Sequence, residues 1–182
     1  MKTDTPPTVN LKDYTPPAFL VDRVDLDFVI ETGGTTVSAT LALRRNPARP
    51  PRPLVLDGEE LETLSVAVDG EKAPFSVTAN TLTIAGVPDA FTLHTVVRID
   101  PDANTGLSGL YRSRDGYFTQ CEAQGFRRIT WFPDRPDVMS TYTVTLHADK
   151  ARFPVLLANG NPVAAGDEAG GRHWAKWADP FR

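Results

Sequence analysis

The sequence is poor in the residues from which active sites are most often assembled. It has one cysteine and three histidines among 182 residues, and the histidines lie far apart. It contains no H-E-x-x-H motif, no C-x-x-C pair and no acidic calcium loop, so no ligand set stands at metal-binding spacing. A single cysteine cannot form an internal disulfide, which fits a reducing compartment. We therefore expect no metal site in this chain and a cytoplasmic location.

Long hydrophobic runs and clusters of positive charge are missing as well. No apolar run approaches the length of a membrane span, and the N-terminus lacks the apolar segment of a secretory signal. The net charge is −4 and no basic patch stands out, which argues against nucleic acid as a partner. We expect a globular protein with no nucleic-acid partner and no membrane partner.

What the sequence does have is β-strand alternation. Apolar residues occupy every second position in 24–30 and 37–43 around Gly33-Gly34, which predicts an antiparallel hairpin with one buried face. Short strands with turn residues between them are typical of a sandwich or barrel. Further strands are predicted at 54–56, 64–68, 75–77, 82–84, 91–99, 129–132, 141–148, 155–158 and 173–177.

The remaining segments complete one β-rich domain over residues 1–182. Residues 1–17 are rich in proline and threonine and are expected to run extended over the surface. The proline-rich stretch 46–53 predicts an exposed loop. Short helical turns are expected at 59–64 and 136–140. The predicted fold class is all-β, an antiparallel sandwich or saddle with a few short helical turns.

Polar and aromatic residues concentrate between positions 119 and 137, and this is where we expect a site. In a strand, residues i and i+2 point the same way. Gln120 and Glu122 would then share one face while Cys121 faces the core. A carboxylate beside a carboxamide suits a small cation such as an amine. The alternatives are an exposed polar strand face, or a local ion pair of Glu122 with Arg127 or Arg128.

The other reactive groups of this segment have simpler interpretations. Cys121 could act as a nucleophile only beside a histidine base, and a small buried thiol is the competing interpretation. The arginines and aspartates are expected to form structural ion pairs around the turn 133–136, with carboxylate recognition by arginine as the alternative. These charged residues are Arg127, Arg128, Asp134, Arg135 and Asp137.

Three motifs carry a resemblance to a known family. They are GLY at 109–111, TQCEAQGFR at 119–127 and DRPDV at 134–138. Shorter matching pieces are LKDY at 11–14, LDGE at 56–59, NTGL at 104–107, LANGN at 157–161, GRHW at 171–174 and DPF at 179–181. Over essentially its whole length the chain resembles the N-terminal domain of bacterial aminopeptidase N, a family of gluzincin-type zinc metallo-aminopeptidases.

The resemblance implies a β-saddle or sandwich that lies against a thermolysin-like catalytic domain of the same polypeptide. It implies that Glu122 binds the free α-amino group of the peptide substrate and that Gln120 lines the pocket for its first side chain. In the full-length parent, zinc would polarise the scissile carbonyl and activate the attacking water. The partners implied are the N-terminus of a peptide and the catalytic domain.

The chain departs from the family pattern in one respect. The zinc motif, the G-x-M-x-N segment, the general-base glutamate and the transition-state tyrosine are absent and are expected beyond Arg182. The chain alone is therefore expected to be inactive and to bind no zinc. The alternatives are a stand-alone β-sandwich binding module, separable by whether the reading frame continues, and a cysteine hydrolase built on Cys121.

Overall fold

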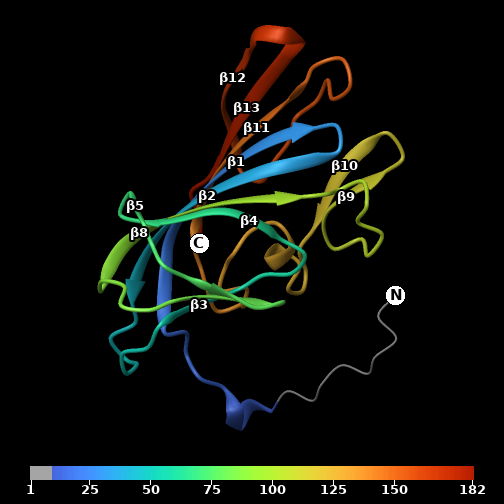
Figure 1. Ribbon diagram of the computed structural model, residues 1–182. Coiled ribbons are helices and arrows are strands. Elements are labelled where there is room, and N and C mark those ends of the chain that lie inside the picture. The colour runs from blue at the N-terminus through green and yellow to red at the C-terminus, as the bar shows by residue number, and fades with distance from the viewer. Residues whose placement is uncertain (1–9) are drawn as a thin grey trace.

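A computed structural model describes residues 10–182, and within that range the chain is all-β with three short 3-10 helices. An eight-stranded sheet has the order β12-β13-β11-β1-β2-β8-β4-β5, and β10-β9 and β3-β7-β6 form two smaller sheets (Figure 1). The elements are η1 (Leu11–Asp13), β1 (Phe19–Glu31), β2 (Gly34–Arg45), β3 (Leu54–Asp57), β4 (Glu62–Val68), β5 (Glu71–Lys72), β6 (Ser76–Val77), β7 (Thr81–Ile84), β8 (Ala90–Ile99), β9 (Gly109–Ser113), β10 (Gly116–Gln120), η2 (Phe126–Arg128), β11 (Thr141–Asp149), β12 (Asn161–Asp167), η3 (Ala169–Gly171) and β13 (Arg172–Asp179).

The predicted hairpin is the centre of the main sheet. Strands β1 and β2 pair antiparallel from Phe19↔Arg45 to Glu31↔Gly34, and Gly33 takes the positive φ of +81° that its tight turn requires. Strand β8 then pairs with β2, which places Leu93 opposite Leu41. Among the strands that the structure describes, β1 and β11 form a parallel pair, so the main sheet is of mixed direction. The predicted all-β class is confirmed.

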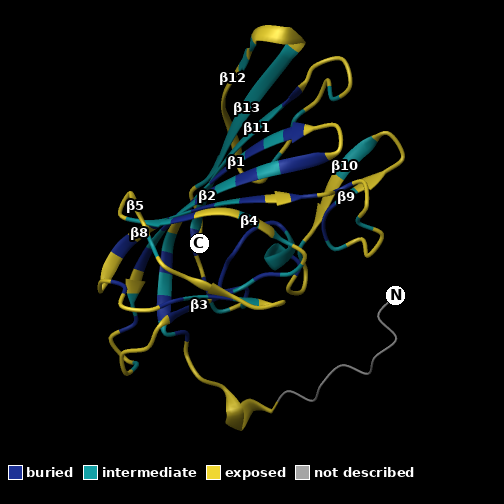
Figure 2. Ribbon diagram, viewed as in Figure 1, coloured by how far each residue is buried: buried dark blue, intermediate teal, exposed yellow. Residues whose placement is uncertain are grey.

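The core lies between the main sheet and the three-stranded sheet. Alternate residues of β1, β2 and β8 are buried, and they meet Leu54, Leu56, Leu82 and Ile84 of β3 and β7. Figure 2 shows this buried half of the molecule, whereas the β12–β13 end is intermediate or exposed. The two-layer packing explains why short strands with one apolar face suffice to build the fold.

Two predicted strands are wrong. Residues 129–132 follow η2 as an irregular segment that makes only one isolated bridge, Asp57↔Phe132. Their apolar character comes from burial, since Ile129 and Trp131 are 2% exposed. The exposure of residues 155–158 does alternate, with Val155 and Leu157 exposed, but these residues pair with no other strand among the described residues.

Neither segment predicted to be a helical turn is helical, and the three 3-10 helices lie at other positions. Residues 59–64 form no helix, because Glu60 has a φ of +57° and β4 begins at Glu62. Residues 136–140 contain only a turn, in which the Val138 amide donates to the carbonyl of Arg135. The loop 46–53 is confirmed. Of the predicted extended segment 1–17, residues 1–9 lie outside the described residues, and η1 interrupts the rest.

Candidate functional site

The segment singled out by the sequence forms a tight turn at the end of β10. Gln120 is the last residue of that strand and pairs with Gly109 of β9. The turn is closed by the Gly125 amide, which donates to the Cys121 carbonyl at 2.7 Å. Glu122 therefore lies in the turn, and the prediction that it continues the strand face of Gln120 is wrong. The peptide bond between Glu122 and Ala123 is cis.

The structure nevertheless brings Gln120 and Glu122 together. The side-chain amide of Gln120 donates to the main-chain carbonyl of Glu122 at 3.0 Å. The Glu122 side chain is exposed and, within residues 10–182, forms neither a hydrogen bond nor an ion pair. The predicted alternative of a local pair with Arg127 or Arg128 is therefore wrong. A carboxylate held by a tight turn and left without a cation can accept the donors of an ammonium group.

The charged residues that follow the turn, at 127–137, are all paired. Arg127 donates from Nε to Asp134 at 3.0 Å, and Arg135 binds Asp137 at 2.6 Å, so the predicted structural ion pairs are confirmed for these residues. The Arg135 guanidinium holds the pKa of Asp137 below its usual range. Carboxylate recognition by these arginines would require breaking these pairs.

Arg128 departs from that local pattern. Its Nη1 binds Glu59 at 2.5 Å and its Nη2 binds Glu60, residues almost seventy positions earlier in the chain. The sequence prediction missed both glutamates as neighbours of the site. The only signal in the sequence was that Glu59 belongs to one of the short motifs shared with the aminopeptidase family.

A groove of about 860 Å³ lies beside the turn, and Glu122 is among the residues that line it. Its wall is largely apolar, with β1 and β11 contributing Phe28 and Leu146 and the exposed side chains of Phe118, Val155 and Leu157 at the surface. Burial in this wall raises the pKa of Tyr142 to about 12. The site therefore has the free carboxylate of Glu122 at the edge of a largely apolar surface, which Asp115 and Asp179 also line.

Cys121 does not have the surroundings of a nucleophile. It packs against the core, and burial together with the negative charge of Asp134 raises its pKa to about 11. None of the three histidines hydrogen-bonds with it in the part of the chain that the structure describes. His94 contacts Thr40, His147 lies between Asp27 and Glu168, and His173 contacts the Phe153 carbonyl. These contacts argue against the cysteine-hydrolase alternative.

The described residues also lack a candidate metal centre and a membrane span. No three histidine, cysteine, aspartate or glutamate side chains in 10–182 are placed to hold one ion. The same residues include no helix that is both long and apolar enough to cross a membrane.

Comparison with known proteins assigns this fold to a class of protein. The sequence profile of the peptidase M1 N-terminal domain family matches residues 21–182, and the chain belongs to that family. Aminopeptidase N of Caulobacter vibrioides is 52% identical over 184 residues, covering 100% of this chain and 21% of the relative. Aminopeptidase N of Escherichia coli is 42% identical over 180 residues, covering 98% and 21%. The resemblance to aminopeptidase N is confirmed.

Solved structures support the same assignment. Legionella pneumophila aminopeptidase A in complex with aspartic acid matches with a TM-score of 0.88 and 29% identity, over 93% of this chain and 21% of that one. An M1 zinc metallopeptidase from Deinococcus radiodurans has a TM-score of 0.76 at 16% identity over 90% and 39%, and it shows the fold alone. The chain spans about a fifth of the length of the curated relatives it matches.

The half-buried thiol of Cys121 gives a direct prediction. Because its pKa is raised to about 11, the thiolate fraction at pH 8 should be about a hundredfold lower than for a free cysteine. Alkylation by iodoacetamide, followed by mass spectrometry, should be slow in the native protein and fast after unfolding in urea. Equal native and unfolded rates would contradict the burial argument and would favour a reactive cysteine.

Proposed function

We propose that this chain is the N-terminal domain of a zinc aminopeptidase and that it supplies the anchor for the substrate's α-amino group. Glu122 would bind the ammonium of the peptide, and Gln120 would line the pocket for the first side chain. The observation that carries the proposal is the free carboxylate of Glu122 at the edge of the groove, since the arginines that follow it, Arg127, Arg128 and Arg135, are each paired with another carboxylate.

The roles follow from elementary recognition chemistry. An ammonium leaving water needs a carboxylate to compensate its charge, and Glu122 is free to do so. The tight turn and the Gln120 hydrogen bond fix the main chain on either side of that carboxylate. Fixing the substrate N-terminus in one place decides which peptide bond reaches the reaction centre. Glu122 would thus select for a free N-terminus and take no part in bond cleavage.

The zinc of the proposed enzyme does not fit this chain. Among residues 10–182 no ligand set converges on one point, so the proposal assigns the metal ligands to the remaining part of the parent protein. The alternative function, a stand-alone binding module with this fold, leaves the free carboxylate without a defined ligand. The cytoplasmic location stays a prediction.

The apolar groove is the surface that the rest of the parent protein would cover. The relatives are about five times as long as this chain, and large exposed apolar side chains gather in the groove next to Glu122. Asp179 at the end of β13 also lines the groove, so the polypeptide that follows β13 departs from its wall. We propose the catalytic domain as the occupant, which would place its reaction centre beside Glu122.

Replacing Glu122 tests the amine anchor. In the full-length enzyme, Glu122→Ala should raise KM and lower kcat/KM on a peptide with a free N-terminus by about one to three orders of magnitude, the range for losing a charge-assisted contact. Glu71→Ala, an exposed glutamate on β5, is the matched control. If kcat/KM of the Glu122 variant equalled that of the control, the assignment would be wrong.

Introducing a charge into the groove tests the domain contact. Val155 is 68% exposed and lines the groove, whereas Val163 on β12 is 58% exposed and does not. In the full-length protein, Val155→Asp should lower Tm by about 5 °C because it buries an unpaired carboxylate, and Val163→Asp should not. Equal Tm values for the two variants would show that the groove stays open to solvent.

A further inference from the structure

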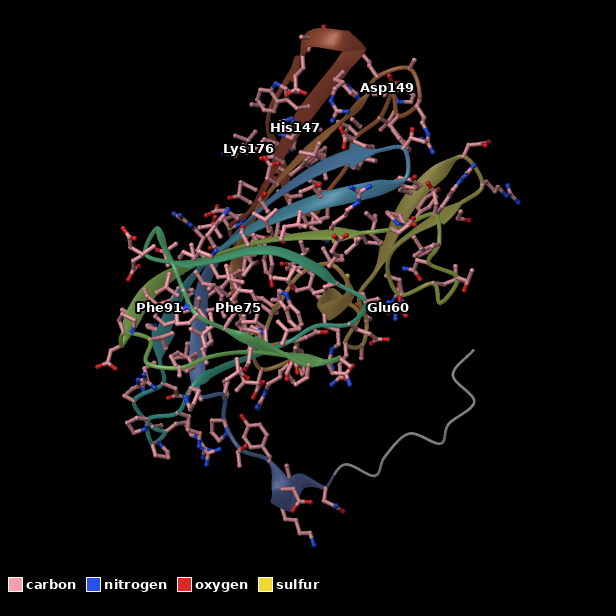
Figure 3. The ribbon with its side chains drawn as sticks, viewed as in Figure 1. Glu60, Phe75, Phe91, His147, Asp149 and Lys176 are labelled. Carbon is pink, nitrogen blue, oxygen red and sulfur yellow. The ribbon has the colours of Figure 1, made fainter. Side chains whose placement is uncertain are left out.

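The ion pairs of Arg128 lie next to the Glu122 turn, and of its two partners Glu59 is 27% exposed and Glu60 is 69% exposed. The Arg128 side chain is 11% exposed, and its two terminal nitrogens bind Glu59 and Glu60. Its Nε is buried without a partner, so the two carboxylates compensate all of its charge within the described residues. Figure 3 places Glu60 beside η2, on the loop that enters β4. A paired guanidinium in such a site holds its position firmly, because moving it would leave a charge unpaired.

Two main-chain hydrogen bonds connect Arg128 to the residue before Glu122. The Arg128 amide donates to the Gly125 carbonyl at 3.1 Å, and the Gly125 amide donates to the Cys121 carbonyl at 2.7 Å. Gly125 has no room for a side chain, since a Cβ there would lie 2.4 Å from the Gln120 carbonyl oxygen. A displacement of Arg128 would therefore be transmitted to the turn.

A second contact connects Arg128 to Gly109 of β9, which pairs with β10. A Cβ added at Gly109 would lie 2.6 Å from Cβ of Arg128, so the backbone of β9 passes directly against that side chain. Gly109 is also the ladder partner of Gln120. Arg128 thus touches the supports of both proposed ligand-binding residues, Gln120 and Glu122.

The loop that carries the two glutamates is itself attached to the same segment. The Glu59 amide donates to the Arg127 carbonyl at 2.9 Å, so the Glu59–Arg128 ion pair is reinforced by a neighbouring main-chain bond. Arg127 is held independently by Asp134. The Arg128 clamp, defined as Arg128, Glu59 and Glu60, thus ties the β3–β4 loop through side chains to the segment that follows the Glu122 turn.

We propose that the Arg128 clamp positions the Glu122 carboxylate for amine binding, with Arg128 and Glu59 as positioning residues that do not touch the substrate. The proposal rests on the amine-anchor function of Glu122. Weakening the clamp lets the turn shift, which misplaces the carboxylate relative to the ammonium and weakens substrate binding.

The experiment uses the full-length enzyme and the mild variant Glu59→Gln, which keeps the shape of the side chain and removes its charge. KM for a peptide with a free N-terminus should rise about tenfold while kcat changes less than twofold. Glu71→Gln on β5 should leave both constants unchanged. Arg128→Lys, which keeps the charge but loses the two-pronged geometry, should give an intermediate KM.

A double-mutant cycle separates positioning from a general loss of structure. In the Glu122→Ala background, Glu59→Gln should change KM less than twofold, because no carboxylate remains to be misplaced. A tenfold effect that persists in that background would overturn the positioning role, as would a Glu59→Gln enzyme identical to the Glu71→Gln control. If Glu122→Ala alone leaves KM unchanged, the amine anchor itself fails, and the clamp proposal fails with it.

Discussion

The close approach of the β3–β4 loop to the segment after β10 is the constraint on which the site depends. Asp57 and Phe132 exchange two main-chain hydrogen bonds, and the Glu59 amide binds the Arg127 carbonyl. Between them, Gly58 lies so close to Trp131 that a Cβ would stand 2.1 Å from its ring. The end of β3 with the loop after it is thus held against η2 and the segment after it over several consecutive residues. The contact fixes the segment that follows Glu122, including the arginines behind it.

The electrostatics of the site follow from that contact. Arg127, Arg128 and Arg135 are each bound to a carboxylate, at distances of 2.5 to 3.0 Å. Glu122 is left without a cation, on the side that faces the groove. Pairing these arginines with other carboxylates keeps the Glu122 carboxylate uncompensated and available, which is the requirement for recognising an ammonium group. The apolar wall beside it would lower the local dielectric once covered, and so strengthen that recognition.

Much of the fold could be predicted from the sequence, because period-2 alternation reports directly on a half-buried strand. The hairpin of β1 and β2 and strand β8 follow from it. The failures at 129–132 and 155–158 have one cause: apolar residues indicate burial but not whether a ladder partner exists. The i, i+2 spacing predicted that Gln120 and Glu122 lie together, and they do. The reason given was wrong, because Glu122 lies in a turn and not on the strand face of Gln120. The Glu59–Arg128 pair was beyond local analysis because it joins residues 69 positions apart.

The central claim is that Glu122 of this domain binds the substrate's free amino group, and a crystal structure of the full-length protein with a bound amino acid tests it most directly. The account predicts a Glu122 carboxylate oxygen within about 3 Å of the ligand's α-nitrogen, with the turn unchanged. Electron density that places the amino group elsewhere, with Glu122 in contact only with solvent, would contradict it.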